Sequence, residues 1–140
     1  IPSLVDCNDD CFLAPQSMIE AVQKFCQDTD QQVPETPGEI ASVIYNSLAK
    51  CYGDTAEEIQ QITGRKYSTI YVEGGGSNAD YLNCLTARYT GKNVSAGPSE
   101  ATAIGNIAVQ MLHDGVFTSL SEARTCIGRS FGVAIYRPEE

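Results

Sequence analysis

The segment from residue 69 to residue 96 constrains the fold of this chain most, because it alternates extended and helical patterns around three consecutive glycines. An apolar run from Thr69 to Val72 predicts a strand that ends at about Glu73. Apolar residues then recur at helical spacing up to a stop at Gly91 (Tyr81, Leu82, Leu85 and Tyr89). A second short strand is predicted at 94–96. Two strands joined through a helix form a βαβ unit, so we expect parallel strands and a right-handed connection.

The glycine turn at residues 74–76 is the main candidate for a binding site. Gly74, Gly75 and Gly76 carry no side chains, so their backbone N–H groups can approach a bulky ligand closely. The helix that follows directs the positive end of its dipole toward the same turn. We expect Ser77 or Asn78 to cap that helix. The arrangement is typical of a site for the phosphates or ribose of a nucleotide, although three glycines in a row also occur in plain surface loops.

Before this segment, the pattern predicts two helices. Pro15 is suited to the first turn of a helix whose apolar face reaches Cys26. A capping box then starts a long helix that ends at Gly64, a residue suited to a left-handed C-terminal cap (Thr36, Pro37 and Glu39).

After the second strand, two more helices are expected. Ser99 is positioned to cap the first of them, and Ser119 with Glu122 offers a capping box for the last. Residues 132–140 are predicted to be extended and polar. Gly105 lies inside the first of these helices at a cost of about 1 kcal/mol against alanine. We therefore expect Gly105 to serve close packing or the approach of a ligand. Together, the predicted elements indicate a helix-rich α/β fold with two or three strands.

The composition excludes several partners. A net charge of −9 argues against nucleic acid, because its binding needs cations that displace counterions from phosphates. No run approaches the roughly 20 apolar residues of a membrane span, so no membrane association is expected. The six cysteines lack zinc-site spacing (Cys7, Cys11, Cys26, Cys51, Cys84 and Cys126). We expect reduced thiols, a cytoplasmic location and no metal-ligating residues within this chain.

A dinucleotide site is an alternative interpretation of the glycine turn. Gly74, Gly76 and Ala79 fit the G-x-G-x-x-G/A pattern. Such a fold also needs an acid at the end of the next strand to hold ribose hydroxyls, and here the first acid is Glu100. The interpretation of the chain as a dinucleotide-binding fragment of an oxidoreductase is therefore weakened, but it stays an alternative. His113, the single histidine, is expected at a helix end, and no catalytic base is identified.

Longer segments carry a family resemblance. Residues 70–77, with Leu82-Asn83 and residues 85–87, resemble the adenosine-site segment of the FGGY carbohydrate kinases. Within residues 96–107, the triplet Gly105-Asn106-Ile107 is similar to the rhamnulokinase subfamily. Four shorter segments look like the same subfamily (12–15, 34–41, 62–66 and 122–124).

The resemblance implies a two-domain actin-like ATPase of the ribonuclease H type. Residues 1–140 would be one fragment, the later part of its C-terminal nucleotide-binding domain, without the N-terminal sugar-binding domain. The implied reaction is phosphorylation of a ketose, L-rhamnulose at O1, with ATP and Mg²⁺. The catalytic Asp is expected upstream, and Ala79 stands where the subfamily has an Asn on the adenine side. The implied nucleotide-binding residues are Gly74, Gly75, Gly76, Ser77, Asn78 and Gly105.

A sheet of two or three strands cannot cover so many apolar helix faces. We therefore expect the 140-residue chain to self-associate through its sheet edge and its exposed helix faces. We also expect it to be inactive without the other half of the cleft. A non-enzymatic actin-like module, which binds nucleotide to switch conformation, is the remaining alternative.

Overall fold

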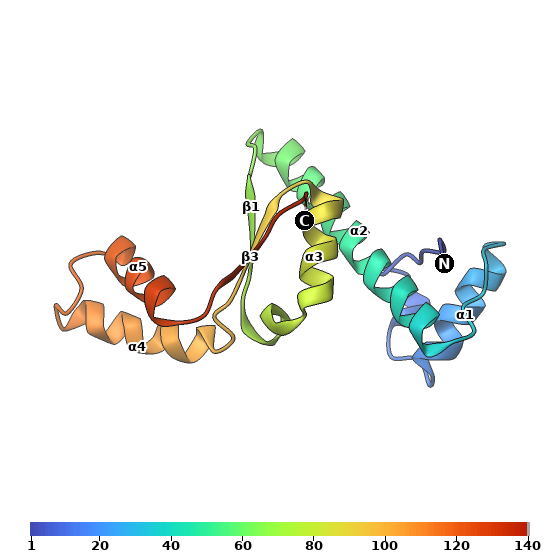
Figure 1. The fold of residues 1–140 in the computed structure, drawn as a ribbon, viewed down its shortest axis with the longest axis horizontal. Coiled ribbons are helices and arrows are strands. Elements are labelled where there is room, and N and C mark those ends of the chain that lie inside the picture. The colour runs from blue at the N-terminus through green and yellow to red at the C-terminus, as the bar shows by residue number, and fades with distance from the viewer. Residues whose placement is uncertain (140) are drawn as a thin grey trace. The chain divides into compact units, whose positions relative to one another are not determined.

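The computed structural model describes residues 1–139, which form two compact units, one from Ile1 to Lys66 and one that begins at Tyr67. The first unit contains the short 3-10 helix η1 (Asp10–Phe12) and the helices α1 (Met18–Asp28) and α2 (Pro37–Thr63), as Figure 1 shows. Helices α1 and α2 enclose a small core to which both contribute (Val22, Cys26 and Val43). Burial of these side chains holds the two helices of this unit together.

The start of α1 differs from the prediction. The helix begins at Met18 rather than near Pro15, because the hydroxyl of Ser17 accepts a hydrogen bond from the backbone N–H of Glu20. Ala14 has φ +54°, a left-handed conformation that cannot belong to a helix. Pro15 therefore lies in an irregular segment before the helix, and the prediction that it starts α1 was wrong.

Helix α2 begins and ends as predicted. The hydroxyl of Thr36 accepts from the backbone N–H of Glu39, and the Glu39 carboxylate accepts from the backbone N–H of Thr36. This reciprocal capping box satisfies N–H groups that have no partner within the helix. At the other end, Gly64 adopts φ +65° as a left-handed cap. The helix runs through Gly53 without a break.

The second unit is built on a small mixed sheet with the strand order β1-β2-β3 in the described residues. Strands β1 (Thr69–Val72) and β2 (Asn93–Ala96) are parallel, which confirms the predicted pairing of the βαβ unit. Between them, α3 (Asp80–Thr90) packs on the sheet and ends at Gly91 in a left-handed cap. Strand β3 (Ala134–Tyr136), in the predicted extended tail, adds to β2 in antiparallel orientation.

Helices α4 (Ala101–His113) and α5 (Leu120–Ser130) follow β2 and precede β3 in the sequence, and they pack on each other (Figure 1). Ser119 caps α5 as predicted by accepting from the N–H of Glu122, whose carboxylate reaches back to Thr118. The predicted cap of α4 was wrong. Ser99 lies one residue before the N-cap position, and its hydroxyl bonds to another loop.

None of the helices in residues 1–139 is long and apolar enough to cross a membrane. The six cysteines are free thiols in this part of the chain, and Cys26 is fully buried in the core of the first unit. Cys26 therefore acts as a small apolar side chain, as its position on a helix face predicts. His113 lies in the last turn of α4, as expected.

Candidate functional site

The glycine turn forms a short 3-10 helix, η2 (Gly74–Asn78), between β1 and α3. Gly74 has φ +73°, a conformation that a side chain would strain. Its backbone N–H donates to the carbonyl of Pro98 at 3.2 Å, and the N–H of Gly97 donates to the carbonyl of Val72 at 2.8 Å. These bonds join the loops that follow β1 and β2. Both loops lie at the carboxyl ends of parallel strands, where α/β proteins bind their ligands.

The predicted cap of α3 by Ser77 or Asn78 was wrong. Residues 74–78 are taken up by η2, so α3 begins at Asp80, and the N-cap residue Ala79 makes no side-chain cap bond. The Ser77 hydroxyl donates instead to the carbonyl of Gly74 at 2.7 Å. Asn78 Oδ1 accepts from the Ser99 hydroxyl at 3.3 Å. Both side chains stabilise the turn rather than the helix.

A buried amide supports the turn from below. Asn83 on α3 is 2% exposed, and its Nδ2 donates to the carbonyl of Ser77 at 3.1 Å and to that of Gly76 at 3.5 Å. Sequence reasoning did not assign a role to Asn83. A buried polar side chain needs a hydrogen-bond partner, but the pattern alone did not show that this partner is the turn.

A hollow of about 370 Å³ opens beside the turn, between the loops after β1 and β2 and the segment before β3. It brings together two of the predicted residues, Ser77 and Asn78, with several that were not predicted (Asp80, Ala96, Ser99, Gly132, Val133 and Ala134). No lysine, arginine or histidine lines it among the described residues. The hollow therefore presents hydroxyl, amide and carboxylate groups, which suit an uncharged, polar part of a ligand.

The predicted site glycines Gly75, Gly76 and Gly105 do not line this hollow, and they differ in the space that they leave for a side chain. Among residues 1–139, a Cβ on Gly75 would meet nothing within 4 Å, and one on Gly76 only the side chain of Val72 at 3.7 Å. The space in front of Gly75 is therefore open, which suits the approach of a ligand to its backbone, whereas a Cβ on Gly76 would contact Val72 at an ordinary van der Waals distance. A Cβ on Gly105 would also meet nothing within 4 Å in the described chain, so close packing there does not require glycine. Its role toward a ligand stays a prediction.

Gly97 is a site-forming glycine that sequence reasoning missed. Its φ is +118°, and a Cβ would lie 2.6 Å from the carbonyl oxygen of Gly132. Only glycine allows the loop after β2 to approach the segment before β3 so closely. This approach forms one wall of the hollow.

Asp80 and Tyr136 form a second contact that the sequence did not reveal. The Tyr136 hydroxyl on β3 donates to Asp80 Oδ1 at 2.6 Å, across 56 residues of sequence. This hydrogen bond, with a smaller contribution from burial, raises the pKa of Tyr136 above its ordinary value of 10. The hydroxyl, which is protonated at neutral pH even at the ordinary value, therefore keeps its proton to a higher pH.

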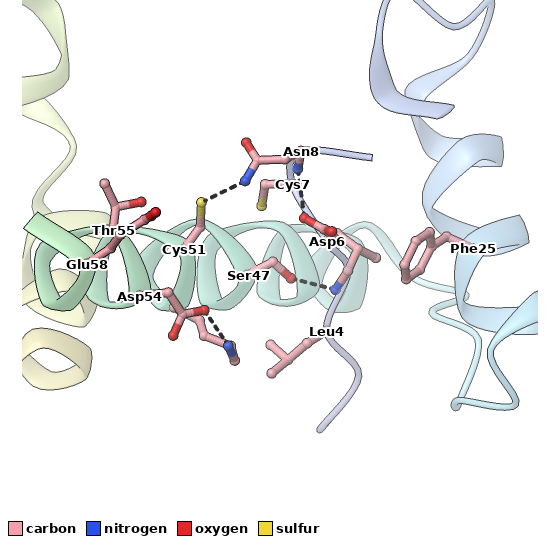
Figure 2. Close-up of a pocket in the computed structure, with 12 residues that line it drawn as sticks. Leu4, Asp6, Cys7, Asn8, Phe25, Ser47, Cys51, Asp54, Thr55 and Glu58 are labelled. Carbon is pink, nitrogen blue, oxygen red and sulfur yellow. Dashed lines mark hydrogen bonds and ion pairs between the residues drawn. The ribbon is translucent and has the colours of Figure 1, made fainter. Parts of the chain in front are cut away.

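A larger hollow of about 500 Å³ lies in the first unit, where residues 4–8 run along α2 (Figure 2). The backbone N–H of Val5 donates to Ser47 Oγ at 2.9 Å, and Asn8 Nδ2 donates to Cys51 Sγ at 3.6 Å. Burial raises the pKa of the Cys7 thiol, and Cys51 and Asp6 raise it further. None of the predicted site residues lies in this hollow.

No group of three or more His, Cys, Asp or Glu side chains that could hold a metal ion occurs in the described part of the chain.

Residues 2–113 match the model of the C-terminal domain of the FGGY family of carbohydrate kinases. The chain therefore belongs to this family, and its helix-rich α/β fold with a small, partly parallel sheet is that of a fragment of an actin-like ATPase domain. The predicted fold class is confirmed.

The similar proteins narrow the family further. A rhamnulokinase from Enterococcus faecalis is 47% identical over 135 residues, which are 95% of this chain and 27% of the relative. Rhamnulokinases from Oceanobacillus iheyensis and Bacteroides thetaiotaomicron are 45% and 41% identical and cover 96% and 99% of this chain. This chain spans 28% of the length of each of the latter two. The resemblance to the rhamnulokinase subfamily is thereby confirmed.

Proposed function

We propose that this chain supplies part of the nucleotide-binding half of a sugar kinase that phosphorylates L-rhamnulose at O1 with ATP. The observation that carries the proposal is the coincidence of two features. The family match includes the glycine turn, and this turn borders a polar hollow at the carboxyl ends of β1 and β2. The sugar is taken from the relatives, which are rhamnulokinases.

The residues of the hollow fit a nucleotide. The space at Gly75 is open, and its N–H is one of the first in the 3-10 helix η2, so it has no partner within that helix and can donate to the α-phosphate. The N–H of Gly74 already donates to Pro98, so Gly74 contributes the shape of the turn instead. Ser77 and Asn78 line the adenosine side, and Asn78 stands next to Ala79, where the subfamily has its adenine-side Asn. Gly105 on α4 is the last of the predicted nucleotide-binding residues.

ATP supplies the phosphoryl group, and this chain contributes its positioning. Phosphoryl transfer depends mainly on alignment and on stabilisation of the transferred charge. The described residues contain no group of three or more His, Cys, Asp or Glu side chains that fits a metal ion. Following the family resemblance, we place the catalytic Asp and the ligands of Mg²⁺ upstream of residues 1–140. We therefore expect the 140-residue chain alone to show no turnover. The free thiols suit the reducing cytoplasm, where we place the complete kinase.

The proposal is tested by ADP release from the complete kinase with Mg-ATP across a panel of ketoses that includes L-rhamnulose. Selective stimulation by L-rhamnulose is expected. Stimulation by a different ketose would contradict L-rhamnulose as the substrate but would still support a ketose kinase. ATP binding without stimulation by any sugar would favour the actin-like switch module. A fluorescence titration with NADH, in which no binding is expected, separates the kinase from the oxidoreductase alternative.

A further inference from the structure

Asp80 is placed to bind a ligand in the hollow beside the glycine turn. Its Oδ1 accepts the hydrogen bond from Tyr136, while within residues 1–139 its Oδ2 accepts none. It is the only charged side chain that lines the hollow in the described structure. One oxygen of the carboxylate is therefore fixed by the protein, and the other is available to a ligand.

Tyr136 fixes the direction of this carboxylate through the sheet. It lies on β3 in register with Val94 of β2, so strand pairing determines the position of its hydroxyl. A tyrosine hydroxyl is protonated at neutral pH, so Tyr136 supplies the donor proton. A ligand-binding group whose orientation is set before binding loses less conformational freedom when the ligand arrives.

The charges around the hollow decide which part of a nucleotide belongs at Asp80. A phosphate is disfavoured there, because the carboxylate is negative and no lysine, arginine or histidine lines the hollow among the described residues. Hydroxyl groups are favoured, because a carboxylate accepts hydrogen bonds and donates none. Asn78 adds a donor, since its Oδ1 is occupied by Ser99 while its Nδ2 bonds to no group in residues 1–139. Adjacent hydroxyls, which both donate and accept, match this pair.

We propose that Asp80, held in place by Tyr136, recognises the ribose hydroxyls of the nucleotide. This inference rests on the proposed function, because it assumes that the hollow holds a nucleotide. The phosphates then lie toward Gly75 and Gly76, away from the carboxylate. The hydroxyls of the ketose are the other source of the same chemistry, and the experiment distinguishes the two.

The test compares the binding of ATP and of 2′-deoxy-ATP to the complete kinase by calorimetry. We expect the wild-type protein to bind ATP about tenfold more tightly than the deoxy compound, the size of one charge-assisted hydrogen bond. Asp80→Asn should reduce this ratio to about twofold or less. Tyr136→Phe should give an intermediate ratio, which a purely structural role of Tyr136 would leave unchanged. The KM for the ketose should stay the same in both variants.

Glu20→Gln is the matched control, because it also removes a carboxylate from the first turn of a helix but lies in the other unit. It should leave the ratio as in the wild type. A wild-type ratio near one, or an unchanged ratio in Asp80→Asn, would overturn the role of Asp80 while leaving the kinase in place. A raised ketose KM in Asp80→Asn with an unchanged ratio would assign the carboxylate to the sugar. Absence of any nucleotide binding by the wild type would overturn the proposed function together with this inference.

Discussion

Gly97 determines the shape of the hollow because it lies where two loops come closest. A Cβ at this position would lie 2.6 Å from the carbonyl oxygen of Gly132, and φ is +118°. The contact is with backbone, so no side chain can move aside to relieve it. The residue without a side chain is therefore as important to the site as the residues that line it.

Gly97→Ala should destabilise the chain by about 2 kcal/mol or more, because it adds both a strained φ and a clash with backbone. Denaturant unfolding of the 140-residue chain measures the change. Gly128→Ala on α5 is the control, since a Cβ there meets nothing within 4 Å in the described residues and no positive φ is involved. We expect the control to be stabilising by about 0.5–1 kcal/mol. Equal stability of the two variants would contradict the close approach at Gly97.

Gly75→Val tests access to the backbone of the turn. The position has no close neighbour in residues 1–139, so folding should tolerate the new side chain while a ligand loses its space. We expect the ATP KM of the complete kinase to rise about tenfold or more, at a nearly unchanged melting temperature. Gly128→Val should leave the KM as it is. An unchanged ATP KM in Gly75→Val would argue against the glycine turn as part of the nucleotide site.

At the scale of elements, the caps of the long helix make stability depend on pH. The Glu39 carboxylate accepts hydrogen bonds from the backbone N–H groups of Thr36 and Glu35, and these lower its pKa below the ordinary value of 4.5. A carboxyl whose pKa is lowered by folding stabilises the folded state above its unfolded pKa. This contribution is lost as the pH falls below 4.5 and through the lowered folded pKa.

Glu39→Gln should therefore be less stable than the wild type at pH 6–7, with the difference shrinking as the pH falls toward 3. Denaturant unfolding across this pH range measures both proteins. Glu20→Gln is a suitable control, because Glu20 also lies in the first turn of a helix but its carboxylate forms no capping box in the described residues. A constant difference between Glu39→Gln and the wild type at all pH values would contradict the charged capping box.

Elements whose signals are local were predictable from the sequence. The capping box of α2, the left-handed caps at Gly64 and Gly91 and the parallel β1–β2 pair depend on residues close in the chain, or on the general rules of βαβ units. The start of α3 was not, because the 3-10 helix η2 depends on bonds between loops more than twenty residues apart. The same holds for Asp80, whose partner Tyr136 is known only once β3 pairs with β2.

At the scale of the whole molecule, apolar surface exceeds what the described chain can cover. Tyr71 on β1 is 73% exposed, Ile62 on α2 is 77% exposed and Val109 on α4 is 64% exposed. In residues 1–139, β1 pairs only with β2, so its other edge presents unpaired backbone groups. Large exposed apolar side chains and an open strand edge are features through which chains associate.

We therefore expect the 140-residue chain to self-associate in solution, with an average sedimentation coefficient that rises with protein concentration. Because the chain spans 27–28% of the length of its relatives from Enterococcus faecalis and Oceanobacillus iheyensis, the complete kinase should show less of this behaviour. Tyr71→Lys tests the cause, since a lysine on an edge strand opposes pairing with another chain. It should shift the distribution toward the monomer, whereas Lys24→Gln, on the exposed face of α1, should not. A monomer at all concentrations in sedimentation velocity would show that the open edge of β1 and the exposed helix faces do not drive association.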